Sequence, residues 1–124
     1  MKRVITTFKS DDISLFKKKL FRWSESSGTS ICLDSNNYPG RLGDLDMILA
    51  IDSYSKLPFT NNNSLEKLDD YLSKTKDWVF GYFSYDLKNE LEDLESNNNS
   101  VFILPNLFFF QPKKIWFIKS GNIE

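Results

Sequence analysis

The sequence predicts an α+β fold with mostly antiparallel sheets and two or three helices. Strand and helix patterns follow one another in the order strand, helix, two strands, helix, strand, without the regular βα alternation of a doubly wound sheet. Three asparagine-rich clusters mark loops, and no internal repeat is present. Because 124 residues is the length of one ordinary domain, we expect a single domain over residues 1–124.

The first two predicted elements are a strand and a helix. β-Branched residues over 3–8 indicate the strand. Ser10 is a suitable N-cap for a helix expected over 11–24, whose lysines at 17–19 we place on a solvated face. Four apolar residues recur at helical spacing and are expected in the core: Ile13, Phe16, Leu20 and Trp23.

Two neighbouring strands are predicted next, at 29–34 and 44–52, joined by a loop at 35–40 that is rich in turn residues. One face of the second strand is apolar and carries Leu45, Met47, Leu49 and Ile51. Asp44 and Asp46 share the other face. Because they lack a third ligand, we interpret them as solvent-side charges and not as a metal site.

The segment 77–85 reads DWVFGYFSY and predicts a strand buried on both sides, because both of its faces carry apolar residues. Gly81, in mid-strand, suggests that another backbone or a bulky ring passes close by. A helix starting at Ser64 precedes this strand, and Asp86 can cap a short helix after it. The apolar sides of these two helices carry Leu65, Leu68 and Leu72, and Leu87, Leu91 and Leu94.

The last part of the chain predicts a hairpin, with strands at 107–111 and 114–118 around Pro112 and Lys113. Three consecutive phenylalanines, at 108–110, cover both faces of its first strand. Either this hairpin is central in the fold, or it awaits a covering layer.

Composition argues against several classes of function. Sixteen basic and seventeen acidic residues leave a net charge of −1, and no basic segment would draw a polyanion, so nucleic acid is not an expected partner. The chain has no histidine and one cysteine, Cys32, which argues against histidine-assisted nucleophiles and ordinary zinc sites. Without a membrane-length apolar stretch or a secretory signal, we expect a cytoplasmic chain that begins at Met1 and does not enter a membrane.

Three motifs carry a resemblance that spans nearly the whole chain. They are ICLDS at 31–35, LDMILA at 45–50, and a tryptophan followed by GYFSYDL and a glutamate, carried by Trp78, Gly81, Tyr85, Asp86 and Glu92. Their ordered set resembles the amino-terminal part of component I of 4-amino-4-deoxychorismate synthase (para-aminobenzoate synthase), with component I of anthranilate synthase as the near relative. The resemblance implies the amino-terminal portion of a chorismate-binding enzyme fold. Since those enzymes are several times longer, it also implies that the rest is missing after Glu124.

In this family the carboxyl-terminal half supplies the magnesium-binding glutamates and holds chorismate. The resemblance therefore implies no catalytic residue and no metal ligand in these 124 residues, which we expect to be inactive alone. The full enzyme would use magnesium, would receive ammonia from a glutamine amidotransferase subunit, and would aminate chorismate on the route to p-aminobenzoate and folate. The carboxyl-terminal half of the same chain would be the principal partner.

The family's amino-terminal segment can hold tryptophan, and the matching position here is Ser35. Ser35 could bind the polar end of an amino acid, or it could simply begin a turn with Asn36. Leu42 and Gly43 stand where tryptophan-holding members often have a ring and a hydroxyl, so we expect weak tryptophan binding or none.

Tyr85 and Asp86 are a strand end and a helix cap in one interpretation and ligand contacts in another. Glu92 is interpreted as a salt-bridge partner and not as a general base. Two alternatives to the folate-branch segment stay open. One is an anthranilate synthase segment, and the other is a free-standing module that binds a small molecule or a protein.

Overall fold

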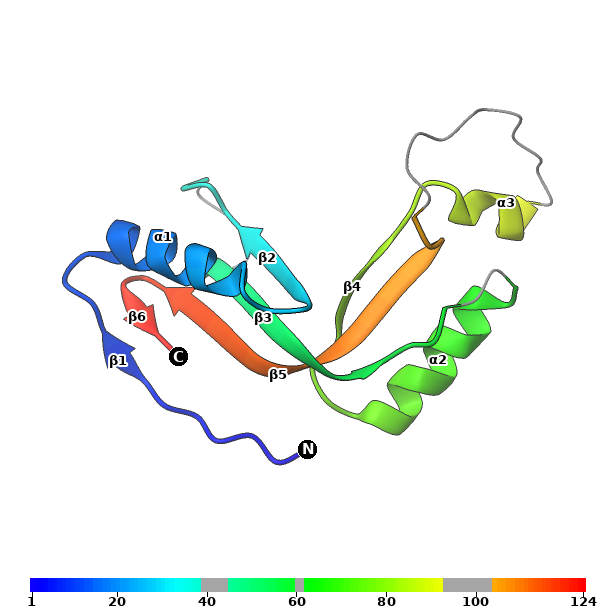
Figure 1. Ribbon diagram of the computed structural model, residues 1–124, viewed down its shortest axis with the longest axis horizontal. Helices are drawn as coiled ribbons and strands as arrows, with labels where there is room; N and C mark the ends of the chain where they lie inside the picture. Colours follow the sequence, from blue (N-terminus) through cyan, green and yellow to red (C-terminus); the bar gives the residue numbers. More distant parts are fainter. Residues whose placement is uncertain (39–44, 60–61, 93–103) are drawn as a thin grey trace. The chain divides into compact units, whose positions relative to one another are not determined.

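The computed structural model describes residues 1–38, 45–59, 62–92 and 104–124, and the fold is α+β as predicted. Over these residues six strands form one mostly antiparallel sheet with three helices (Figure 1). The strand order is β1-β6-β5-β3-β2, and β4 pairs with β5 beside this path. None of the helices in the described ranges is both long and apolar enough to cross a membrane.

The elements follow one another in the predicted order up to α3, after which one long strand replaces the two strands predicted at 107–111 and 114–118 and a short strand follows it. Their bounds are β1 (Phe8–Lys9), α1 (Ile13–Ser24), β2 (Ser30–Asp34), β3 (Leu45–Lys56), α2 (Ser64–Thr75), β4 (Phe80–Phe83), α3 (Leu87–Glu92), β5 (Leu107–Lys119) and β6 (Asn122–Ile123).

The chain divides into two compact units. The terminal unit comprises residues 1–53 and 112–124, and the central unit comprises residues 54–111. Strands β3 and β5 each contribute one part to the terminal unit and one part to the central unit. Each unit has its own apolar core.

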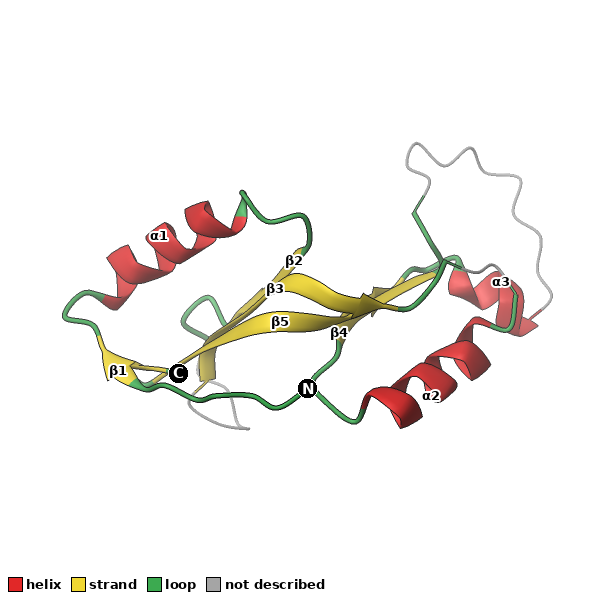
Figure 2. Cartoon of the chain, turned by 60° about the horizontal axis from the view of Figure 1, so that its bottom comes forward, coloured by secondary structure: helices red, strands yellow, loops and turns green. Residues whose placement is uncertain are grey.

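The core of the terminal unit lies between α1 and the sheet (Figure 2). It is formed by Leu20, Met47, Leu49, Ile51, Ile118 and Ile123, with Ile13, Phe16, Cys32 and Trp116 packed against it. The predicted apolar face of β3 is thereby confirmed for its buried residues, and so is the antiparallel pairing of β2 with β3. Trp23, which the helical pattern placed in the core, is instead substantially exposed and contacts Trp116 edge-on.

The start of the chain differs from the prediction at two points. Only Phe8 and Lys9 form a strand, because only they reach a partner, β6, whereas Val4 and Ile5 are exposed. The helix begins at Ile13, since its N-cap is Asp12 and not Ser10. The Asp12 side chain accepts a hydrogen bond of 2.9 Å from the Leu15 amide, which satisfies a free donor of the first turn.

The predicted hairpin at Pro112 and Lys113 is wrong, because β5 runs without a break from Leu107 to Lys119. Pro112 is fully buried, and its carbonyl oxygen accepts a hydrogen bond of 2.9 Å from Arg3. The actual turn follows β5, where Ser120 and Gly121 have φ of 47° and 81° and connect β5 to β6. Two consecutive residues with positive φ are typical of a tight two-residue hairpin turn.

Strand β3 also continues beyond its predicted end. Asp52 has a φ of 56°, in the left-handed region, yet its amide still donates to Thr29 across the β2–β3 pair. The chain then extends as far as Lys56. A short polar residue can adopt this conformation at a local irregularity, so the change of alternation that ends the sequence pattern does not end the strand.

The central unit packs α2 on one face of its strands, around Leu57, Leu68, Leu87 and Leu107, with Tyr71 and Phe109 beside them. Phe109 and Phe110 lie on opposite faces of β5, so the predicted coverage of both faces is confirmed. Strand β4 is shorter than predicted and is not buried on both sides. Phe80 is buried, but Phe83 is exposed, because α2 and α3 leave this strand partly uncovered.

The close approach predicted at Gly81 is confirmed. A Cβ atom at this position would collide with the Phe108 carbonyl oxygen, and it would lie 2.5 Å from ring atoms of Phe109. Both obstacles belong to the adjacent strand β5, so neither can move without disturbing the pairing. Glycine is therefore needed here to let β4 and β5 pair beneath the Phe109 ring.

We predict that Gly81→Ala lowers the free energy of unfolding by about 1–3 kcal/mol, because the new methyl group overpacks the β4–β5 pair. Gly28→Ala is the matched control, since a Cβ at Gly28 meets nothing within 4 Å. It should change stability by less than about 0.5 kcal/mol. Urea denaturation followed by tryptophan fluorescence measures both, and equal stabilities for the two variants would contradict the account of Gly81.

Candidate functional site

The residues of the GYFSYDL motif lie in the central unit, along β4 and the corner that leads into α3. Gly81 is in β4, Tyr85 and Asp86 form the turn, and Glu92 ends α3. The Tyr85 side chain is 80% exposed, and the Lys88 ammonium lies 4.0 Å from the centre of its ring. Trp78 instead lines a shallow hollow together with Leu72 and Lys76. The motif residues therefore follow one strand and its corner without converging on a common pocket in the described part of the chain.

Glu90, which the sequence patterns did not single out, has the most polar contacts in this corner. Its carboxylate accepts hydrogen bonds from the Ser64 amide at 3.2 Å, the Ser64 hydroxyl at 2.8 Å and the Asn106 side-chain amide at 2.6 Å. The Asn106 carbonyl in turn accepts from the Ser84 amide at 2.8 Å. Glu90 thus ties α3 to the start of α2 and to the residue before β5.

The role of Glu90 explains how α2 begins. Asn63 occupies the N-cap position but makes no side-chain capping bond, and Ser64 is the first helical residue. The Glu90 carboxylate supplies the missing acceptor, and its charge suits the positive end of the helix dipole. Partial burial raises the pKa of Glu90, but the hydrogen bonds from Asn106 and Ser64, with Lys67 nearby, together bring this pKa below its usual range.

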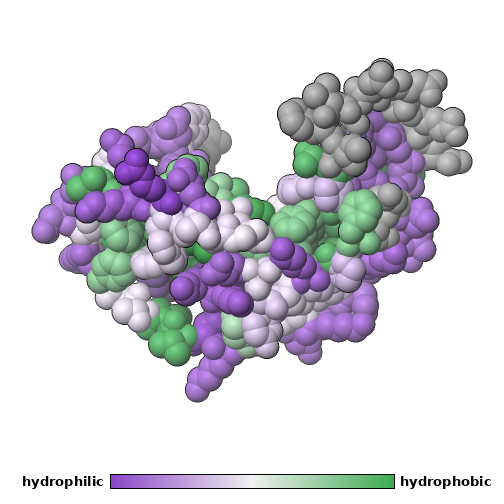
Figure 3. Space-filling model, in the orientation of Figure 1, coloured by the Kyte–Doolittle hydropathy of each residue, from purple (hydrophilic) through white to green (hydrophobic). Residues whose placement is uncertain are grey.

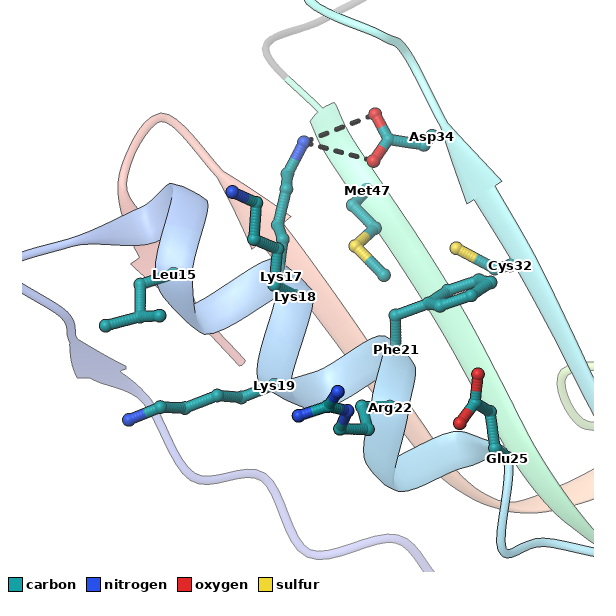
Figure 4. A pocket seen from close by; sticks show the side chains of 10 residues that line it. All are labelled: Leu15, Lys17, Lys18, Lys19, Phe21, Arg22, Glu25, Cys32, Asp34 and Met47. Atoms are coloured by element: carbon teal, nitrogen blue, oxygen red, sulfur yellow. Dashed lines mark hydrogen bonds and ion pairs between the residues drawn. The ribbon is translucent and has the colours of Figure 1, made fainter.

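The terminal unit contains a hollow of about 700 Å³ between α1 and the strands β2 and β3 (Figure 4). Its sides come from residues of α1, among them Leu15, Lys17 and Phe21, and from Cys32, Asp34 and Met47 of the two strands. Figure 4 shows the Phe21 ring turned toward Cys32, with Met47 between the helix and β2. The hollow therefore has an apolar interior with charged groups around it.

Lys17 departs from the solvated face predicted for the lysines at 17–19. Its ammonium group lies 3.2 Å and 3.3 Å from the two carboxylate oxygens of Asp34, and its side chain is only 18% exposed (Figure 4). Lys18 and Lys19 are exposed as predicted. The ion pair joins α1 to β2 at one side of the hollow, which the sequence could not show because 17 residues separate the partners.

The hollow is chemically suited to holding an apolar group, with the cations of α1 available to an attached anion. It is poorly suited to nucleophilic catalysis. Partial burial, and then the Asp34 carboxylate, raise the pKa of the Cys32 thiol, while Lys17 lowers it. The thiol is therefore protonated near neutral pH and unreactive. Over the residues that the structure describes, no group of three or more His, Cys, Asp or Glu side chains could hold a metal ion.

Ser35 lies directly after β2, next to this hollow in sequence but outside its lining. Its amide donates to the Asp46 carbonyl and its own carbonyl accepts from the Tyr38 amide, both at 2.9 Å. Ser35 therefore begins a turn, in which Asn36 and Asn37 have positive φ. Leu42, Gly43 and Asp44, which bear on the tryptophan and metal interpretations, lie outside the described residues.

The chain matches no family model, no curated protein and no solved structure. The assignment of a function consequently rests on the motifs of the sequence and on the geometry described above. The two candidate sites are the Glu90 corner of the central unit and the hollow beside α1 in the terminal unit.

We predict that Glu90→Gln lowers the free energy of unfolding by about 1–2 kcal/mol at pH 7, the cost of losing a helix cap. Glu92→Gln is the matched control, because Glu92 is an exposed residue of the same helix. It should change stability by less than about 0.5 kcal/mol. Thermal or urea unfolding measures the difference, and equal losses in the two variants would contradict the capping role.

The same pair of variants should show a defined pH dependence. Because the folded-state pKa of Glu90 is lowered, its ionised form stabilises the fold above the unfolded-state pKa, and this stabilisation is lost as pH falls through the folded-state pKa. The stability gap between wild type and Glu90→Gln should therefore narrow below about pH 4.3. A gap that stays constant from pH 7 to pH 3 would show that the charge of Glu90 is unimportant.

Proposed function

We propose that this chain is the amino-terminal, non-catalytic segment of a cytoplasmic enzyme of the 4-amino-4-deoxychorismate synthase component I type, with the corresponding part of a chorismate-binding enzyme fold. The observation that carries the proposal is the ordered set of three motifs and their positions in one antiparallel sheet. ICLDS falls on β2 and the residue after it, LDMILA falls on β3, and GYFSYDL falls on β4 and the start of α3. The motifs thus coincide with the strands and the corner that build the fold.

The occupied carboxylates support a structural role for the segment. Glu90 accepts three hydrogen bonds, two of which fix the start of α2, and Asp34 is paired with Lys17. A general base or a metal ligand needs lone pairs that are available to a substrate or an ion, whereas these two groups direct theirs toward the protein. In the proposed enzyme, magnesium and chorismate are held by the carboxyl-terminal half, and ammonia comes from the glutamine amidotransferase subunit.

The surface of the chain supports a large partner. Hydrophobic side chains reach the surface of both units (Figure 3). In the central unit the exposed ones outside the 78–85 segment include Tyr54, Phe59, Leu91 and Leu104. Burying exposed apolar side chains of this kind is what a protein–protein interface would gain. The carboxyl-terminal half of the same enzyme is the partner that the proposal assigns to this surface.

We predict that the chain alone does not consume chorismate in the presence of ammonium and magnesium, and that a separately produced carboxyl-terminal half of the same enzyme type gains activity when the chain is added. An increase of at least about tenfold, or 1.4 kcal/mol in the barrier, is expected because the segment completes the fold of its partner. Loss of chorismate is followed by absorbance, and the product is identified by chromatography. Aminodeoxychorismate supports the folate branch, whereas anthranilate would assign the segment to the tryptophan branch.

Two outcomes would contradict this proposal. One is turnover by the chain alone that a point substitution within it abolishes. The other is a carboxyl-terminal half whose activity does not change when the chain is added. Gly81→Ala provides a control in the mixture, since a chain with a disrupted β4–β5 pair should activate less than the wild type.

We also predict that tryptophan binds to the chain only weakly, with a dissociation constant above about 1 mM, which corresponds to less than 4.1 kcal/mol. The reason is that the family's ring and hydroxyl are replaced by Leu42 and Gly43, so a buried amino-acid headgroup would lack partners. Isothermal titration calorimetry measures this affinity. Micromolar binding that Ser35→Ala abolishes would show that a tryptophan site is present.

A further inference from the structure

Strand β4 has one paired edge and one open edge. Over the described residues it pairs only with β5, in the register Phe80↔Phe110 to Phe83↔Leu107. The Ser84 amide donates to the Asn106 carbonyl, so residues at even positions of β4 direct their backbone groups toward β5. Gly81 and Phe83, at the odd positions, consequently direct their N–H and C=O groups toward the open edge.

Within its own sequence this edge lacks the residues that normally protect a strand from pairing with another chain. The eight residues 78–85 contain no charged residue and no proline. Protection usually comes from charged residues or proline, or from a bulge or a covering loop. The edge strand β2 differs in this respect, because it ends in Asp34, whose carboxylate is paired with Lys17.

Aromatic side chains flank the open edge. Phe83 is 54% exposed, although one side of its ring contacts Phe109 at a centroid distance of 5.0 Å. Tyr85, just beyond the strand, is more exposed still. These rings are placed to gain burial when a further strand lies alongside β4.

We propose that the open edge of β4 pairs antiparallel with β4 of a second copy of this chain, about a two-fold axis at Tyr82. In this register Gly81 and Phe83, whose backbone N–H and C=O groups face the open edge, both lie opposite residues of the second strand whose backbone groups also face that edge. Gly81 then lies opposite Phe83 of the second copy, in two hydrogen-bonded pairs, and the two Tyr82 residues form the central non-hydrogen-bonded pair. The Phe83 ring of the second copy then lies on the same face as Phe109, whose ring covers Gly81.

The distribution of charge around β4 favours a second copy of the chain as the partner. In the proposed register Asp86 lies opposite Trp78, and Asp77 lies opposite Leu87, so no two carboxylates face each other. An uncharged edge gains nothing from a charged partner strand, whereas a copy of itself is uncharged over the same length. Pairing along this edge does not require the proposed role in chorismate chemistry.

The first test is sedimentation velocity of the full chain over a hundredfold range of concentration. A concentration-dependent dimer is expected, and Phe83→Lys should weaken dimerisation at least about tenfold by placing a charge at the paired edge. Leu33→Lys is the matched control, because Leu33 has the same 54% exposure on the other edge strand, β2. It should leave dimerisation unchanged. A chain that stays monomeric at every concentration, or equal effects of the two lysines, would overturn the proposal.

The second test fixes the register and does not depend on the folding of Phe83→Lys. In a Cys32→Ser background, Tyr82→Cys should form a disulfide-linked dimer under mild oxidation, because Cα atoms of a non-hydrogen-bonded pair lie about 4.5 Å apart, within disulfide range. Tyr85→Cys is more exposed, but its two copies would lie about 20 Å apart. Cross-linking of Tyr85→Cys as fast as Tyr82→Cys would contradict the register.

Discussion

The constraint on which this fold depends is that one strand, β5, serves two apolar cores. Its first residues pair with β4 in the central unit, and its last residues pair with β6 in the terminal unit. Where β5 passes from one unit to the other, Gln111 and Pro112 place no amide proton in the sheet: the Gln111 amide donates to the Tyr71 hydroxyl, and proline has none. The Gln111 side chain is buried, and its polar atoms are satisfied: its oxygen accepts a hydrogen bond of 3.1 Å from the Ser55 hydroxyl, and its amide group donates one of 2.8 Å to the Asp77 carboxylate.

The course of β5 through both units also explains which parts of the fold the sequence could predict. Period-two and helical patterns located α1, β2, most of β3 and α2, and a run of apolar residues on both faces located β4. They failed at Pro112 and Asp52, since proline and a change of alternation indicate a turn locally. In the structure Pro112 is buried in a continuous strand, and its carbonyl oxygen accepts a hydrogen bond from the distant Arg3. The short β6 was missed because two residues carry no periodicity.

The candidate sites were less predictable than the fold. Spacing within the motif directed attention to Glu92, yet the carboxylate that organises the corner is Glu90, whose partner Ser64 lies 26 residues earlier. The Lys17–Asp34 pair has the same character, because it depends on how α1 lies over β2. The sequence carried no signal for Glu90, because Asn63 and Ser64 are both ordinary capping residues, and only the structure shows that Asn63 makes no side-chain capping bond.

Two buried polar atoms at the corner between β4 and α3 make no hydrogen bond that the described residues show. The Ser84 hydroxyl oxygen and the Asn89 side-chain oxygen are buried there without a hydrogen-bond partner among the described residues. Each such group costs about 1–3 kcal/mol. Ser84 is part of GYFSYDL, and the same motif leaves the Phe83 and Tyr85 rings exposed. The exposed rings are the part of this segment that the proposals above cover with another polypeptide, whereas the two unpartnered atoms are already enclosed within the central unit.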